Sequence, residues 1–208
     1  MKSSLITVGV FAAGCLLGYY DVIPGDFLGD RAAVIILQVL MFLVGVGIGS
    51  DPNLLKILKS VDFKILLLPL STIVGTLSFS ALVALFISKW SVWDCMAVGS
   101  GFGYYSISSV LISEIKTDII GAQLATELAA IALLTNVFRE LFTLVGTPLM
   151  YKLFGPFAPI SSAGVTSVDV AMPVIARVAG NAIVPYALIH GVLVDVSTPF
   201  FVTFFCSL

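Results

Sequence analysis

Long apolar stretches alternate with short polar segments along the whole chain. The apolar runs cover residues 4–20, 32–49, 65–88, 96–112, 119–150, 161–177 and 182–208. Most of them approach or exceed the ~20 residues that a helix needs to cross a bilayer. The pattern predicts an all-α integral membrane protein in which residues 1–208 form a single transmembrane domain. About seven hydrophobic segments are expected, some of them broken or re-entrant.

The polar connectors predict how these segments are oriented. The connector at 51–64 carries three lysines, and lysine-rich connectors are typical of the cytoplasmic side of a membrane. The acidic loop at 21–31 then faces outward. The segment 89–94 contains two tryptophans and marks a membrane interface, with Asp94 in the water beside it. A further charged connector is expected at 114–118.

One apolar run, residues 161–177 (SSAGVTSVDVAMPVIAR), carries an acid and a proline in its interior. An ionised Asp169 near the centre of a membrane helix costs ~2.5–3.5 kcal/mol, and Pro173 removes a backbone donor. Thr166 and Ser167 add polar groups at the entry to the run. We expect a short or broken helix that lines a wet cavity, because lipid does not tolerate free backbone groups. The alternative is a kinked packing helix whose acid pairs with an arginine.

A second interrupted stretch, GSGFGYYSISS, lies at residues 99–109 in the middle of an apolar run. Such a stretch is a poor lipid-facing helix and a good lining for a polar path. The alternative is that its small residues only let helices pack closely. The residues expected at a helix break or in a cavity lining are Gly99, Ser100, Gly101, Gly103, Tyr105, Ser106 and, from the other stretch, Pro173.

A polar stripe crosses the long apolar run at 119–150. Asn136 lies three and four residues before Arg139 and Glu140, which places the three side chains along one side of a helix. Arg139 and Glu140 are roughly 100° apart on that helix, so each needs another partner. Because Arg177 lies ~12 Å beyond Asp169 on a regular helix, Arg139 is the better counter-ion for Asp169. Pro148 is expected to end this element.

The last apolar run contains His190 and Asp195. They are five residues apart and point in directions ~140° apart on a regular helix, so they are not expected to form a local catalytic pair. A single histidine within a membrane is either a hydrogen-bonded packing residue or a proton carrier. Both interpretations remain open for His190.

Composition narrows the function classes. The chain is 59% hydrophobic and 11% charged, far from the ~25% charged residues of a soluble domain. A net charge of −2 without a basic cluster argues against nucleic-acid binding. The scattered cysteines indicate neither a disulfide framework nor a metal site, and we expect no cofactor.

The chemistry favours transport over catalysis. HExxH and GxSxG motifs are missing from the sequence, so the chain is expected not to be an enzyme, with a membrane-embedded Ser/His hydrolase as the remaining enzymatic possibility. Two acids, Glu140 and Asp169, together with two interrupted segments, are what a cation site midway through a membrane is built from.

Three motifs resemble the bacterial lysine exporter family of LysO type. They are GSGFGYYSISSVLI at 99–112, NVFREL at 136–141 and PISSAGVTSVDVAMPVI at 159–175, in the order and spacing of the family. The resemblance covers the C-terminal two-thirds of a family member. It implies that Glu140 and Asp169 occupy positions where the family keeps acids needed for lysine export. It also implies a distant relationship to cation/proton antiporters and bile-acid symporters, with inverted repeats and crossing broken helices.

Because a full-length family member begins with roughly a hundred further residues of membrane helices, we expect a separate small membrane subunit to supply them. A truncated chain is the alternative, and a homo-oligomer is also open. The predicted function is export of L-lysine and close basic analogues across the bacterial inner membrane by a multi-pass, proton-coupled antiporter. Arg139 would keep one acid ionised or bind the substrate carboxylate. The competing functions are antiport of sodium or another organic solute, and a non-transporting membrane subunit.

Overall fold

The computed structural model describes residues 13, 16–17, 20 and 63–208, with the backbone alone for Asn181. The predicted segments at 4–20 and 32–49, the acidic loop and most of the lysine-rich connector therefore lie outside the described residues. The chain divides into two compact units, residues 1–44 and 45–208. The elements discussed below all belong to the second unit.

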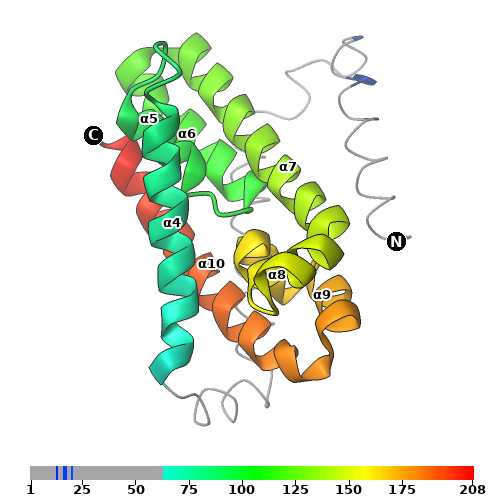
Figure 1. Ribbon diagram of the computed structural model, residues 1–208. Coiled ribbons are helices and arrows are strands. Elements are labelled where there is room, and N and C mark those ends of the chain that lie inside the picture. Colours follow the sequence, from blue (N-terminus) through cyan, green and yellow to red (C-terminus); the bar gives the residue numbers. More distant parts are fainter. Residues whose placement is uncertain (1–12, 14–15, 18–19, 21–62) are drawn as a thin grey trace. The chain divides into compact units, whose positions relative to one another are not determined.

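The regular elements of residues 63–208 are all helices, with no strand in this part of the chain (Figure 1). Two of the helices are long and apolar enough to cross a membrane, and a third apolar helix is shorter. Large apolar side chains such as Phe79, Phe86, Val145 and Phe200 are exposed on this unit, as expected of a surface that faces lipid. The described elements are η2 Phe63–Leu66, α4 Leu67–Val83, α5 Val92–Gly99, α6 Tyr105–Ile120, α7 Ala122–Phe154, α8 Ala158–Ala163, η3 Gly164–Val168, α9 Met172–Ala179, η4 Asn181–Ile183 and α10 Val184–Cys206.

Helix α7 is the longest element and packs along α6. It has 33 residues, or ~50 Å of helix, and it begins and ends at glycines with positive φ, Gly121 (+87°) and Gly155 (+85°). The prediction that Pro148 ends the helix is wrong, because Pro148 lies inside α7. The hydroxyl of Thr147 bonds back to the carbonyl of Thr143 at 2.6 Å beside the proline. Such local bonds are one way in which membrane helices accommodate an internal proline.

The core of this unit lies where α5, α6, α7 and α10 meet. Apart from Phe205, its buried side chains are small or aliphatic, so the four helices approach closely. Figure 1 shows α5 and α6 beside the upper half of α7, with α10 running past them to the C-terminus. The buried members include Ala97, Ile112, Leu128, Ala132 and Val202.

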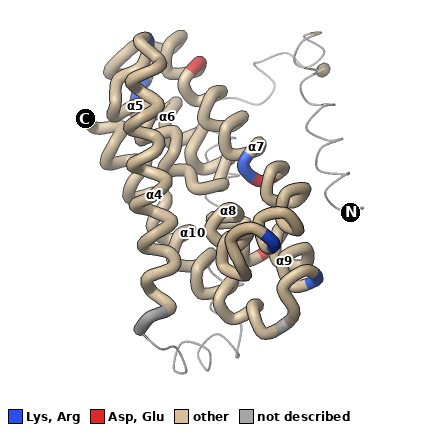
Figure 2. The backbone as a smooth tube through the Cα atoms, viewed as in Figure 1, with Lys and Arg blue, Asp and Glu red and all other residues tan. Residues whose placement is uncertain are grey.

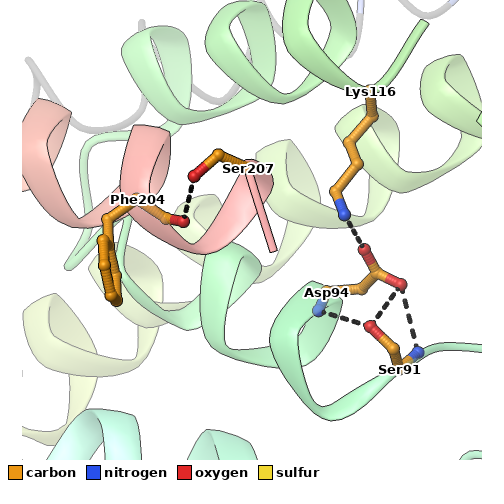
Figure 3. Close-up of polar contacts among 5 residues, drawn as sticks. All are labelled: Ser91, Asp94, Lys116, Phe204 and Ser207. Atoms are coloured by element: carbon orange, nitrogen blue, oxygen red, sulfur yellow. Dashed lines mark hydrogen bonds and ion pairs between the residues drawn. The ribbon is translucent and has the colours of Figure 1, made fainter. Parts of the chain in front are cut away.

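A buried ion pair corrects two predictions at the start of α5 and the end of α6. Ser91 caps α5 by accepting from the Asp94 N–H at 3.0 Å, and the Asp94 carboxylate accepts from the Ser91 N–H in return. Asp94 is not in water. It is 7% exposed and pairs at 2.8 Å with Lys116, which is 3% exposed (Figure 3). The predicted connector at 114–118 is likewise wrong, since α6 continues to Ile120 and carries Lys116 to this partner.

Candidate transport site

Two interrupted helices meet inside the unit. The chain unwinds between α5 and α6, where Phe102 and Gly103 both have positive φ, and again from Gly164 to the start of α9. The Val165 N–H donates to the Phe102 carbonyl at 2.9 Å and joins the two breaks. Gly164 cannot carry a side chain, because a Cβ there would lie 2.0 Å from the Phe102 oxygen. Both stretches that the sequence marked as interrupted are therefore confirmed as breaks.

Asn136 on α7 holds the first break. Its Oδ1 accepts from the Gly103 N–H at 2.7 Å, and its Nδ2 donates to the Ala132 carbonyl at 2.8 Å and to the Ser108 hydroxyl at 3.3 Å. A Cβ on Gly101 would lie 2.4 Å from the same Nδ2, so the approach requires glycine. An unwound chain leaves backbone groups without helical partners. Asn136 supplies one partner and thereby positions the break.

Arg139, one turn further along α7, holds the second break. Its Nε donates to the Ser162 carbonyl at 2.9 Å and its Nη2 to the Ser161 carbonyl at 3.1 Å. Its Nη1 donates to the Thr76 hydroxyl at 3.3 Å. The prediction that Arg139 is the counter-ion of Asp169 is wrong for the described part of the chain. Because α8 ends at Ala163, its last carbonyls lack helical partners and accept from the guanidinium instead.

Glu140 lies on α7, and Asp169 lies in the second break between η3 and α9, where it is exposed. Charged positions are sparse along the described helices, and an adjacent arginine and glutamate stand out on α7 (Figure 2). Glu140 is only 6% exposed, and among the described residues its carboxylate has no hydrogen bond and no ion pair. Asp169 follows η3 and accepts from the Val170 N–H. The two carboxyls are close enough to interact electrostatically.

Tyrosines and a third acid complete the surroundings of Asp169. Tyr105 lies within electrostatic range of Glu140 and Asp169, and Tyr104 lies within electrostatic range of Asp169 and Asp195. Asp195 on α10 also interacts with Asp169 itself. The sequence prediction gave Asp195 no role. The available signal was an acid inside an apolar helix, which is a candidate functional residue by default.

His190 bridges several elements from α10. It is fully buried, with Nδ1 3.1 Å from the Ser167 hydroxyl and Nε2 2.9 Å from the Thr72 hydroxyl. Thr72 in turn lies 2.7 Å from the Ser161 hydroxyl. This network joins α4, α8, η3 and α10, which supports the packing interpretation of His190. A role as proton carrier stays a prediction.

Other predicted residues lie near the breaks but have mainly local partners. Thr166 donates to the Ala163 carbonyl at 3.0 Å, and Ser100 donates to the Ala97 carbonyl at 2.8 Å. Gly99 borders a cavity of about 330 Å³, and a Cβ there would lie 1.9 Å from the Ser80 hydroxyl oxygen. Ser106 is half-buried on α6. Pro173 is exposed in the first turn of α9, where a missing N–H is tolerated.

The all-helical architecture, with two helices long and apolar enough to cross a membrane, fits a membrane protein. Residues 8–206 match the family described as lysine exporter LysO, so the chain belongs to that family. It is 28% identical over 171 residues to lysine exporter LysO of Escherichia coli (strain K12), covering 82% of this chain and 54% of that protein. The chain thus spans about half the length of this relative.

For a second relative, the match covers a larger share of the relative's own length. A provisionally named lysine exporter of Haemophilus influenzae is 26% identical over 175 residues, and the match covers 83% of this chain and 83% of that protein. No solved structure matches the chain. The named relatives are exporters, which are transporters and not enzymes. The three sequence motifs predict the same family, and the match over residues 8–206 confirms that prediction.

The described side chains form no metal site. Within residues 13, 16–17, 20 and 63–208, no group of histidine, cysteine, aspartate and glutamate side chains could hold a metal ion.

Proposed function

We propose that this chain forms the ion-binding part of an exporter that moves L-lysine and close basic analogues outward in exchange for protons. In this proposal it is a multi-pass protein of the bacterial inner membrane. Glu140 and Asp169 alternately hold a proton or an ammonium group of the substrate. The observation that supports the proposal most directly is the buried Glu140 side chain, which has no cationic partner among the described residues and lies within electrostatic range of Asp169 at a helix break.

The energetics explain why a coupling ion is needed. Lysine carries net positive charge, so moving it outward against an inside-negative potential costs ~2.3 kcal/mol per 100 mV. Exchange of one proton for one lysine moves no net charge, and the pH gradient then drives export. An acid without a permanent cation can hold either partner. A carboxylate locked to an arginine would lose this freedom, and Arg139 is instead engaged by α8.

A second part of the proposal concerns the rest of the transporter. The E. coli relative extends well beyond the matched half. We propose that this chain assembles in the bilayer with a small membrane subunit. Co-purification of the two chains from membranes would support the proposal. A chain that exports lysine by itself would contradict it.

Labelled-lysine uptake into everted membrane vesicles with an imposed pH gradient tests the function. The comparison uses this chain alone, the chain with the candidate subunit, and Asp169→Asn in the active combination. We expect flux that needs both the gradient and Asp169. Flux of lysine that is unchanged in Asp169→Asn would overturn the assignment of the site. Gradient-driven flux of sodium or another solute in place of lysine would overturn the substrate.

A further inference from the structure

Asp195 lies on the side of α10 that packs against η3. Ala187, Gly191 and Asp195 follow one another at intervals of four residues, so they share roughly one side of that helix. The Ala187 carbonyl accepts from the Ser167 hydroxyl at 3.0 Å, and a Cβ on Gly191 would lie 2.7 Å from the same hydroxyl oxygen. Gly191 therefore lets α10 approach η3 directly. Asp195 is one helical turn beyond this contact and lies within electrostatic range of Asp169, which follows η3.

Asp169 is common to two pairs of acids. Glu140 on α7 and Asp195 on α10 each lie within electrostatic range of it. None of the three acids takes part in an ion pair within the described part of the chain. Negative charges that lie close together are unfavourable unless protons or cations neutralise them. The cluster can therefore hold more than one positive charge.

The burial of Glu140 distinguishes this cluster from a solvated acidic surface. Glu140 is 6% exposed, so more than nine-tenths of it is buried, and its carboxylate has no hydrogen bond among the described residues. Asp195 is half-buried and likewise has no hydrogen bond there. A buried carboxylate without a partner is unfavourable. An ammonium group of a ligand would supply the missing partner.

Two tyrosines from the first break bring hydrogen-bond donors to the same acids. Tyr105 lies within electrostatic range of Glu140 and Asp169, and Tyr104 lies within electrostatic range of Asp169 and Asp195. Both side chains are half-buried, and neither hydroxyl has a hydrogen bond within the described residues. A phenol hydroxyl can donate to a carboxylate. The cluster thus offers acceptors for ammonium groups and donors for a carboxylate.

We propose that Asp195 determines specificity by binding a second ammonium group of the exported amino acid. This inference rests on the proposed function and adds a residue to it. L-Lysine has an ammonium group at each end of its carbon chain and a carboxylate at one end. Glu140 and Asp169 bind one ammonium group, Asp195 binds the other, and the tyrosine hydroxyls donate to the carboxylate. An amino acid with a single ammonium group leaves one acid without a partner, so the site selects diamino acids.

The test is equilibrium binding of three ligands to the transporter, with its subunit where one is needed, in lipid nanodiscs. L-Lysine has both ammonium groups, L-norleucine lacks the one on the side chain, and 6-aminohexanoate lacks the α-ammonium group. We expect wild type to bind lysine at least ~10-fold more tightly than either analogue, because each analogue leaves a carboxylate unpaired.

Asp195→Asn keeps the size of the side chain and removes its charge. It should weaken lysine binding at least ~10-fold, but change the binding of the analogue that lacks the ammonium group bound by Asp195 less than ~2-fold. Asp195→Ser, which also removes the charge, should give the same pattern. Asp195→Glu should still prefer lysine over that analogue. Asp118→Asn is the matched control, because Asp118 is exposed on α6, and it should leave all three affinities unchanged.

Three outcomes would overturn the role of Asp195 and leave the proposed function standing. The first is wild-type protein that binds all three ligands with equal affinity, a comparison that needs no variant. The second is a loss by the same factor for all three ligands in Asp195→Asn, which would indicate a structural role. The third is unchanged lysine binding in Asp195→Asn. Wild-type protein that binds none of the ligands would overturn the proposed function and the role of Asp195 together.

Discussion

Two buried carboxylates in this protein have opposite surroundings. Asp94 is 7% exposed, accepts from the Ser91 cap and pairs with Lys116. Glu140 is 6% exposed and has neither a hydrogen bond nor an ion pair among the described residues. A paired buried charge stabilises one structure, whereas an unpaired one is unfavourable for folding and available to a mobile cation. Under the proposed function, this difference separates a structural acid, Asp94, from a transport acid, Glu140.

Removing the partner of the structural acid should have the largest effect on stability. Lys116→Met leaves Asp94 buried without its cation, which we expect to lower the free energy of unfolding by ~3–5 kcal/mol. Chemical unfolding in a mild detergent measures the change. The double variant Asp94→Asn with Lys116→Met should recover most of the loss, because it removes both charges. A single variant as stable as wild type would show that the pair is not structural.

The next effect should come from the first helix break. Asn136→Ala leaves the Gly103 N–H without its acceptor in a buried site, at an expected loss of ~1–3 kcal/mol in the free energy of unfolding. Thr135→Ala, one residue away and exposed, is the control and should change stability little. If Asn136→Ala were equally harmless, the break would be held by other contacts.

An exposed ion pair should matter least. Lys89 and Glu127 form an ion pair, but their side chains are 51% and 44% exposed. Exposed pairs typically contribute ~0–1 kcal/mol. Glu127→Gln should therefore stay within that range in the same unfolding assay and leave lysine flux unchanged. A loss as large as that of Lys116→Met would mean that burial does not distinguish the two pairs.

The sequence predicted the structure best at residues that are unfavourable inside a continuous membrane helix. Asp169 with Pro173, and the glycines of 99–103, signalled interrupted helices because acids, prolines and glycines are unfavourable in a continuous membrane helix. Both breaks are present. Asn136 and Glu140 were also expected to be polar residues on one side of α7, and both are buried.

Partners between distant segments were harder to predict. Asp94 and Lys116 belong to different helices, and nothing in their spacing shows that α6 returns Lys116 to the start of α5. The partner of Arg139 was missed for a related reason. Two of its three acceptors are backbone carbonyls near the end of α8, and the sequence does not indicate which backbone carbonyls are free to accept. Asp195 was visible as an acid in an apolar helix, but only the structure brings it near Asp169.

The most direct test measures flux and stability on the same preparation of Glu140→Gln, with Glu114→Gln as control because Glu114 is exposed on α6. We predict that Glu140→Gln abolishes pH-driven lysine flux while its free energy of unfolding falls by less than ~1 kcal/mol or rises, since an unpaired buried charge has been removed. Glu114→Gln should change neither quantity. A Glu140→Gln protein that transports lysine normally but unfolds several kcal/mol more easily would contradict the account, because Glu140 would then be a structural acid like Asp94.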